Sequence, residues 1–362
     1  MKQTILLKVD SEKPDVEKIQ IAAEVIQKGG LVAFPTETVY GLGADALNPE
    51  AVLALFEAKK RPLDNPPIIH IARAKEVYKL AQDVPKKAEL LMKEFWPGPL
   101  TLVFKRSNII PEVTVACLDT VAIRMPQHKV ALSLIKQSGR SIAAPSANLA
   151  GKPSPTTATH VYEDLNGRID VILDSGLTNI GLESTVLDMS VDPPMVLRPG
   201  GTTFEALKKV LGEVRLHPFV EAGSELPLEK IRSPGMKHRH YAPKAKVILV
   251  EGSVSAITGK IQRLVEVYEL KGEKVGILAT DETIRFYKAD AAKSLGSRFN
   301  LPVVAQNLFR LLREVDAENV DVIIAEGVPL DGIGLAIMNR LRKASGYHII
   351  QASQTEHDHS KN

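Results

Sequence analysis

The sequence predicts an α/β protein built from two domains. Its 362 residues correspond to roughly two domains of ordinary size. Helical and strand patterns alternate up to about residue 213, stop, and resume near residue 245. Apolar residues make up 44% of the chain and charged residues 25%, a balance typical of folded globular proteins that excludes wholesale disorder.

The first alternation predicts a domain over residues 1–213. Val16, Ile19, Ala23 and Ile26 recur at helical spacing, so a helix is expected there. Another helix begins at 48–49, where Asn and Pro suit an N-cap and a first turn. Further helices are expected at 85–95, 128–138, 156–165 and 203–211, and strands at 31–34, 68–72, 100–104, 120–125, 141–144, 171–174, 184–188 and 194–198. This order predicts a mixed or largely parallel sheet.

Residues 214–244 show no sustained period and are rich in proline, so we expect a linker. Thirty residues without an element are uncommon inside a compact domain and usually form a linker or a functional loop. Residues 232–243 include Pro234 and Gly235, and the polar cluster within them ends in His240 and Tyr241. This mixture suits a lid that orders over a ligand.

A second alternation predicts a smaller domain over residues 245–350. Strands are expected at 245–252, 274–280 and 320–328, and helices at 253–270, 302–317 and 334–344. Strand and helix in repeated order over about a hundred residues favour a Rossmann-like, doubly wound parallel sheet. The polar residues 351–362 are expected to form a disordered tail.

Charge, cysteine content and hydropathy exclude several classes of protein. The 46 Lys and Arg residues nearly balance the 43 Asp and Glu residues, and a net charge of +3 is too small for a general nucleic-acid-binding field. Cys117 is the only cysteine, so an intrachain disulfide and a zinc site of several thiolates are excluded. No apolar run approaches the roughly 18 residues of a membrane-spanning helix. We therefore expect a cytoplasmic protein without a membrane partner.

Any nucleotide site must use an unusual cradle, because the motifs GxxxxGK(S/T), GxGxxG, HExxH and GxSxG are all missing. Residues 34–46, FPTETVYGLGADA, are a first candidate because they are rich in hydroxyls. Gly41 and Gly43 would let the backbone approach a ligand closely. A plain strand-to-helix turn is the alternative for this segment.

A second candidate, KKRPLDNPPIIHI (59–71), follows the end of a helix. Cations such as Lys59 and Arg61 are expected there simply to complement the helix dipole. Prolines stiffen this loop, however, and Asn65 and His70 add polar groups beside the cations. A rigid loop that carries a lysine point charge and an arginine fork suits a triphosphate.

Two further segments carry polar groups next to expected strands. In SIAAPSANLAGKPSPTT (141–157), Ser146 and Asn148 offer a hydroxyl and an amide in a stiff backbone, which suits a phosphate or ribose. In residues 181–201, Ser184 precedes one strand and Arg198 ends another. Ordinary surface turns are the alternative for both segments.

The order of these motifs resembles the YrdC-like domain of threonylcarbamoyl-AMP synthases. TETVYGLG, KKRPLDNPP, FWPGPLTLV, APSANLAGKPSPT and ESTVLD follow one another in the family's order, with K-x-R at 59–61 and S-x-N at 146–148. A linker and a second α/β domain resemble the long form of these enzymes, and the similarity covers residues 5–350. The implied fold is a YrdC-like twisted mixed-sheet domain followed by a small Rossmann-like domain.

The resemblance implies a nucleotidyltransferase that condenses L-threonine, bicarbonate and ATP to threonylcarbamoyl-AMP and pyrophosphate. The product serves threonylcarbamoyladenosine formation at position 37 of tRNA, through a tRNA threonylcarbamoyl transferase complex, and the resemblance allows weak RNA contact. Mg²⁺ is implied on the ATP phosphates, held mainly by phosphate oxygens and water, with no metal ligand from the protein.

The resemblance also implies roles for individual residues. The implied catalytic set is Lys59, Arg61, Ser146 and Asn148. The implied ATP contacts are Arg61, Asn65, Thr120, Ser146, Ser154, Arg198 and Tyr241, with His240 as a neighbour of the last. The implied threonine pocket is Thr38, His70, Arg124, Ala144 and Ser184, with Arg124 on the amino-acid carboxylate.

Two other functions are weighed against the synthase. The first is a double-stranded RNA-binding or translation factor that uses the concave domain as a cradle, but aromatic residues make up only 5% of the chain and no stacking signature is evident. The second is a carbamoyl transferase of hydrogenase maturation. Such proteins carry cysteine-rich zinc segments, and the single cysteine of this chain argues against that function.

Overall fold

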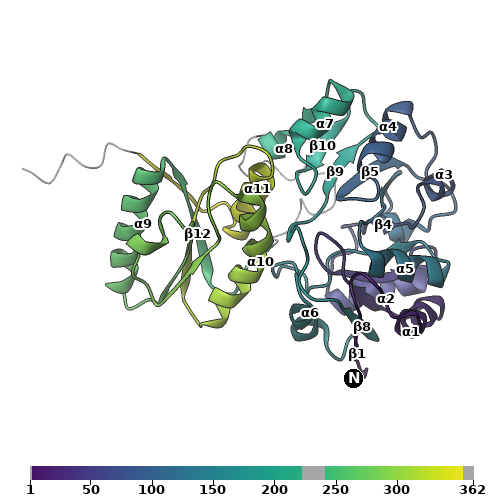
Figure 1. The fold of residues 1–362 in the computed structure, drawn as a ribbon, viewed down its shortest axis with the longest axis horizontal. Helices are drawn as coiled ribbons and strands as arrows, with labels where there is room; N and C mark the ends of the chain where they lie inside the picture. Colours follow the sequence, from purple (N-terminus) through teal and green to yellow (C-terminus); the bar gives the residue numbers. More distant parts are fainter. Residues whose placement is uncertain (1, 222–240, 354–362) are drawn as a thin grey trace, which may run out of the picture. The chain divides into compact units, whose positions relative to one another are not determined.

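The computed structural model describes residues 2–221 and 241–353. The chain divides into two compact units (Figure 1). Among the described residues, the first unit holds 2–150 and 154–221, and the second holds 241–353 together with 151–153. We call these units the first and the second domain. His240 and most of the expected lid, 232–243, lie outside the described residues.

The first domain is an eleven-stranded mixed sheet with helices packed on it. The strand order is β1-β8-β2-β3-β7-β4-β6-β5-β9-β10-β11. Its strands are β1 Ile5–Lys8, β2 Val32–Phe34, β3 Gly41–Asp45, β4 Ile69–His70, β5 Leu100–Lys105, β6 Thr120–Arg124, β7 Ile142–Ala143, β8 Val171–Asp174, β9 Thr185–Asp188, β10 Met195–Arg198 and β11 Arg215–Leu216. Its helices are α1 Val16–Gln27, α2 Pro49–Lys59, α3 Val77–Leu80, α4 Lys86–Phe95, α5 Lys129–Ser138, α6 Ala158–Leu165, α7 Phe204–Leu211 and α8 Pro218–Glu221, with 3₁₀ turns η1 Ala74–Glu76 and η2 Glu112–Val115.

The second domain is a five-stranded, all-parallel sheet of order β14-β13-β15-β12-β16. Its strands are β12 Lys246–Gly252, β13 Val275–Ala279, β14 Ala291–Ser294, β15 Val322–Glu326 and β16 Ile349–Ala352. Its helices are α9 Val254–Glu269, α10 Leu301–Ala317 and α11 Gly334–Ala344, and η4 covers Ile284–Phe286. The Rossmann-like parallel sheet expected from the sequence is confirmed.

Local chemistry explains where the predicted helices begin. The side chain of Asn48 accepts hydrogen bonds from the backbone N–H groups of Glu50 and Ala51, which caps α2. Lys60 then adopts a left-handed φ of 51° and ends the helix, so the chain turns sharply into the cationic loop. The expected helices of the first domain are confirmed within a few residues.

Several elements differ from the sequence-based expectation. Residues 41–45, expected in a loop or turn, form β3 in the middle of the sheet, between β2 and β7. The stretch from 214 was expected to lack elements, yet β11 pairs with β10 and α8 follows it. β1, β14 and β16 were also not predicted, and β16 runs into the expected tail as far as Ala352. The first sheet therefore contains more strands than the sequence pattern indicates.

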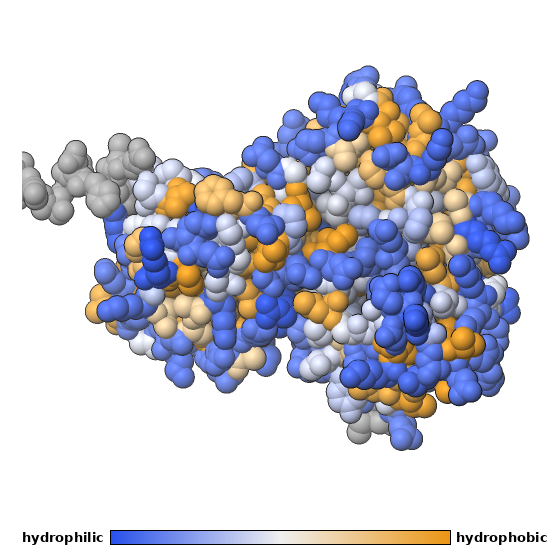
Figure 2. All heavy atoms as spheres, viewed as in Figure 1, coloured by the Kyte–Doolittle hydropathy of each residue, from blue (hydrophilic) through white to orange (hydrophobic). Residues whose placement is uncertain are grey.

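Apolar side chains fill the space between the sheets and their helices. In the second domain, Ile248, Ile277 and Ile324 from three strands pack against Ile257 and Ile261 of α9. On the face drawn in Figure 2, polar residues dominate and apolar residues form separate patches. In the ranges 2–221 and 241–353, no helix is long and apolar enough to cross a membrane.

Candidate active site

Lys59 and the S-x-N loop form the first part of the site. Lys59 is the last residue of α2 and is buried, with its Nζ donating to the backbone carbonyls of Ser146 and Asn148. Burial, and secondarily the charge of Arg61, holds the pKa of Lys59 well below its usual range. The structure thus brings three of the four predicted catalytic residues together, with Lys59 holding the loop in place.

The loop after α2 is organised by Arg61. Its Nε donates to the carbonyl of Asn65 at 2.8 Å, and its Nη2 donates to the carbonyl of Pro66 at 3.3 Å. Asn65 is itself buried. The guanidinium therefore closes a turn of the proline-rich loop, which fixes the predicted ATP contacts Arg61 and Asn65 beside each other.

Arg124 lies at the centre of a buried polar cluster. It ends β6 and is the register partner of His70 in β4. Its Nη1 donates to Thr38 Oγ1 at 2.9 Å and its Nε donates to the Gly98 carbonyl at 3.1 Å. Its Nη2 lies 2.7 Å from Glu37 Oε1, and both of these side chains are about 95% buried. Three predicted threonine contacts, Thr38, His70 and Arg124, are thus neighbours.

The electrostatics of this cluster keep His70 neutral. Burial, together with the neighbouring Arg124 charge, lowers the pKa of His70 from 6.5 to about 3. Its Nδ1 lies 3.2 Å from the Ile68 carbonyl. His70 therefore offers a neutral imidazole beside the guanidinium. An anionic group that enters the cluster would share the Arg124 guanidinium with Glu37.

Ser184 and Arg198 form a second cluster. Arg198, at the end of β10, donates to the Ser184 carbonyl through Nε at 3.1 Å and through Nη2 at 2.9 Å. Nη2 also lies 3.2 Å from Ser184 Oγ. The preceding residue, Glu183, accepts a 2.6 Å hydrogen bond from Ser154. The structure therefore joins one predicted threonine contact to two predicted ATP contacts.

Ala144 and Thr120 differ in their distance from the Arg124 cluster. Ala144 is buried just after β7, and its N–H donates to the Ile68 carbonyl at 2.8 Å, two residues from His70. Thr120 begins β6, whereas Arg124 ends it. At a rise of about 3.3 Å per residue, Thr120 is roughly 13 Å from Arg124. The structure brings Ala144 close to the Arg124 cluster and places Thr120 at the far end of the strand.

Tyr241 belongs to the second domain by its contacts. Its ring stacks on Phe309 of α10 at a centroid distance of 5.1 Å, and the Arg340 guanidinium lies 5.5 Å from the ring centroid. It is buried and adopts a left-handed φ of 64°. These contacts do not test the predicted contact between Tyr241 and ATP.

The sequence motifs did not identify two acidic residues at the site, Glu37 and Glu183. Both are buried, and a buried carboxylate is costly unless a partner or a function compensates for it. Each lies inside a motif that was singled out, TETVYGLG or ESTVLD. The available signal was a carboxylate next to Thr38 or Ser184 in a segment rich in hydroxyl side chains.

A mixed-sheet domain with buried cations and hydroxyls, followed by a parallel-sheet domain, defines a protein of the two-domain YrdC-like class. The family model Sua5_yciO_yrdC, described as "Telomere recombination", matches residues 24–200. The model described as "Threonylcarbamoyl-AMP synthase, C-terminal domain" matches residues 202–346. The chain belongs to the threonylcarbamoyl-AMP synthase family, in its long form.

Individual relatives agree with this membership over nearly the whole chain. The chain is 53% identical to the threonylcarbamoyl-AMP synthase of Pyrococcus abyssi, covering 96% of this chain and 99% of that protein. It is 50% identical to the Bacillus subtilis enzyme of the same name, covering 92% and 94%. The structure of P. abyssi Sua5 complexed with L-threonine has a TM-score of 0.91 and 52% identity, covering 96% of this chain and 100% of that one. These relatives favour a synthase over the RNA-binding factor.

Proposed function

We propose that this protein is a threonylcarbamoyl-AMP synthase that condenses L-threonine, bicarbonate and ATP. The observation that carries the proposal is the buried Arg124 guanidinium, held by Glu37, Thr38 and the Gly98 carbonyl. A guanidinium in a fixed position binds a carboxylate through two parallel hydrogen bonds. This geometry suits the α-carboxylate of an amino acid, and the relatives' name specifies threonine.

We assign the rest of the threonine pocket to residues around Arg124. Thr38 and Ser184 supply hydroxyls, and neutral His70 and Ala144 supply a wall without charge. A small pocket of this kind would hold the threonine side chain and orient its amino group. Holding the reacting groups in the correct orientation lowers the activation free energy, because the entropic cost of aligning them is met on binding.

We assign ATP binding mainly to residues in the loops after α2 and β7 and at the end of β10. The proposed contacts are Arg61, Asn65, Thr120, Ser146, Ser154, Arg198 and Tyr241. Arg61 and Arg198 would bind phosphate oxygens through guanidinium groups that backbone carbonyls hold in place, while Lys59 would act on ATP through the loop that it holds at Ser146 and Asn148. Lys59 is therefore a positioning residue in this proposal.

The proposed chemistry needs no covalent enzyme intermediate. Bicarbonate loses its hydroxyl group, which takes up a proton and leaves as water, to give carbon dioxide. The threonine nitrogen attacks the carbon of carbon dioxide and loses a proton, which gives a carbamate. A carbamate oxygen then attacks the α-phosphorus of ATP while the bond to the pyrophosphate oxygen breaks. The residues above contribute by binding, orienting and excluding water from the labile carbamate.

We further propose that Mg²⁺ enters with ATP and neutralises charge on the phosphates, held mainly by phosphate oxygens and water. In the part of the chain that the structure covers, no three His, Cys, Asp or Glu side chains lie close enough to hold a metal ion. We propose that the protein itself supplies no ligand to this Mg²⁺. We also propose a cytoplasmic location and delivery of the product to a tRNA threonylcarbamoyl transferase complex.

Pyrophosphate release tests the proposal. Full-length protein with ATP and Mg²⁺ should release pyrophosphate only when threonine and bicarbonate are both present. Serine, which lacks the methyl group, serves as a matched substrate control and should support less release. Release that needs neither threonine nor bicarbonate would identify an ATP hydrolase and overturn the proposal.

A further inference from the structure

The second domain contains a topological switch point. β12 and β15 are parallel neighbours, with Val250 opposite Glu326. The chain leaves β12 through α9 toward β13 on one side of this pair, and leaves β15 through α11 toward β16 on the other side. Figure 1 shows α9 on one face of this sheet and α10 and α11 on the other. Ligands of doubly wound sheets bind at such points, beyond the carboxyl ends of the strands.

A pocket of about 170 Å³ lies at this switch point. Gly252 at the end of β12 and Gly327 and Leu330 after β15 form part of its wall. The charged residues that line it are Glu251, Arg298 and Arg342. Pockets that enclose a whole drug-sized ligand are about 300–1,000 Å³. This pocket is therefore the size for one small polar group.

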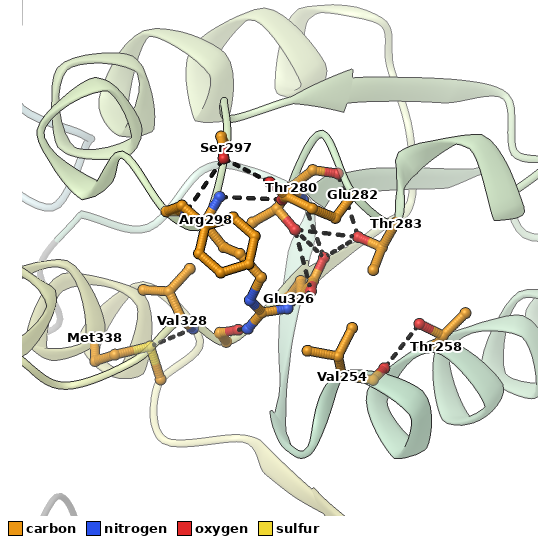
Figure 3. Close-up of polar contacts among 12 residues, drawn as sticks. Val254, Thr258, Thr280, Glu282, Thr283, Ser297, Arg298, Glu326, Val328 and Met338 are labelled. Atoms are coloured by element: carbon orange, nitrogen blue, oxygen red, sulfur yellow. Dashed lines mark hydrogen bonds and ion pairs between the residues drawn. The ribbon is translucent and has the colours of Figure 1, made fainter.

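Arg298 is held in the pocket by a buried carboxylate. Its Nη1 lies 2.8 Å from Oε1 of Glu326, which ends β15 and is fully buried. Figure 3 shows Thr280 and Thr283 contacting the same carboxylate, and the Thr280 N–H donates to Oε2 at 3.0 Å. A buried ion pair often stabilises a fold no more than apolar side chains of similar volume would, because both charges lose their hydration. Its presence behind a pocket indicates that it positions the guanidinium.

Arg342 enters the pocket from α11. Its Nε and Nη2 donate to the two carboxylate oxygens of Glu251, at 2.8 and 2.9 Å, in a fork-to-fork pair. Each guanidinium has five N–H donors. Arg298 uses Nη1 to bind Glu326 and Nη2 to bind the Gly327 carbonyl, and Arg342 uses Nε and Nη2 to bind Glu251. The Val328 N–H, also at the pocket, points to the Met338 sulfur at 3.2 Å, a weak acceptor (Figure 3). The pocket is therefore lined by donors held in fixed positions.

We propose that this pocket binds a phosphate group, free or carried by a nucleotide, between Arg298 and Arg342. Planar guanidinium forks match phosphate oxygens. Leu330 at the pocket is 48% exposed, and Phe299, the residue that follows Arg298, is 88% exposed. An exposed aromatic ring can stack on a nucleobase. A nucleotide therefore binds more tightly here than free phosphate.

The carboxylates set the expected strength of binding. Glu326 and Glu251 each neutralise one of the two arginines, so the pocket carries little excess positive charge. The additional negative charge of a triphosphate should therefore add little affinity compared with a single phosphate group. We expect inorganic phosphate to bind with a dissociation constant of roughly millimolar order. This binding is independent of the proposed synthase activity, because other residues in the other domain form the pocket.

Hydrogen–deuterium exchange of the full-length protein tests this site. The probes are inorganic phosphate, AMP and adenosine, at constant ionic strength set with sodium chloride and without threonine or Mg²⁺. Phosphate and AMP should slow exchange in peptides covering 249–256 and 326–334, AMP at the lower concentration, and adenosine should not. Absence of protection in these peptides with both phosphate and AMP would overturn the proposal.

Two conservative variants keep the test specific. Arg342→Lys and Arg298→Lys retain the charge but lose the fork, so each should weaken the phosphate-dependent protection about tenfold, equivalent to about 1.4 kcal/mol. Arg310→Lys is the matched control, because Arg310 pairs with Glu314 on α10 away from the pocket. Equal protection in all three variants would overturn the assignment, and two separate pocket variants guard against the failure of one to fold.

Discussion

Arg124 and Glu37 form an ion pair of 2.7 Å, Nη2 to Oε1, with 4% and 5% of their side chains exposed. Neither Glu37 oxygen has a hydrogen-bond donor in suitable geometry among the described residues. The pair compensates charge without satisfying the hydrogen-bonding capacity of the carboxylate. This is the arrangement expected where an anionic substrate later shares the guanidinium.

The first prediction concerns this pair. Glu37→Gln leaves the Arg124 charge buried without a counter-ion, and breaking a buried pair in this way costs about 3–5 kcal/mol. Threonine should partly restore the balance, because its carboxylate supplies the missing negative charge. The rise in Tm on adding threonine should therefore be larger in Glu37→Gln than in the unchanged protein.

The control for this experiment is Glu24→Gln. Glu24 pairs with Lys28 on the surface of α1, with 48% of its side chain exposed, so this substitution should change neither Tm nor the threonine effect measurably. A smaller threonine-induced shift in Glu37→Gln would mean that Glu37 binds the substrate ammonium instead.

The second prediction separates the two substrates. Arg124→Lys keeps the charge and loses the bidentate fork, which is worth about 1.5–3 kcal/mol for a charged partner. The KM for threonine should rise about 10- to 100-fold, with a much smaller change in the KM for ATP. Equal changes in both constants, from steady-state pyrophosphate release, would place Arg124 on the nucleotide or in a purely structural role.

The third prediction distinguishes Lys59 from Arg61. Lys59→Met removes two hydrogen bonds to the loop of Ser146 and Asn148, so it should lower both Tm and activity. Arg61→Ala removes a less buried guanidinium at the proposed phosphate site, and should lower kcat about a hundred- to a thousand-fold with a smaller change in Tm. Paired thermal unfolding and rate measurements on both variants test this. Identical profiles for the two variants would contradict the division of roles.

The fourth prediction concerns pH. His70 has a pKa of about 3 in the folded protein against 6.5 in the unfolded chain. The unfolded state therefore binds the proton first, so the free energy of unfolding falls as pH drops below 6.5, by up to about 1.4 kcal/mol per pH unit. His70→Asn removes this contribution and should give a shallower slope between pH 6.5 and about 4.5 in urea titrations. Parallel slopes would show that His70 is not the buried neutral group inferred here.

The sequence predicts those elements whose chemistry is local. Helix α2 could be located because Asn48 caps it through its own side chain. β3 could not, because Gly41–Asp45 lacks the branched side chains of a typical strand. Gly43 is required there by packing: an added Cβ would meet Phe34 and Ile142 at 2.8 Å. That requirement exists only once the neighbouring strands are in place.

The same limit applies to the site. The motifs identified the loops of Lys59, Arg61 and Ser146, but not the direction of each side chain. Lys59 and Arg61 are two residues apart, yet Lys59 points back into the domain while Arg61 closes its own loop. The left-handed turn at Lys60 causes this divergence, and a sequence pattern does not show it.

The most direct test of the central claim is the fate of the bicarbonate carbon. Full-length protein is incubated with ATP, Mg²⁺, threonine and either ordinary or carbon-13-labelled bicarbonate, and the adenylate product is analysed by mass spectrometry. We predict threonylcarbamoyl-AMP that carries the label and forms together with pyrophosphate. An unlabelled threonyl adenylate, or AMP alone, would contradict the proposed function.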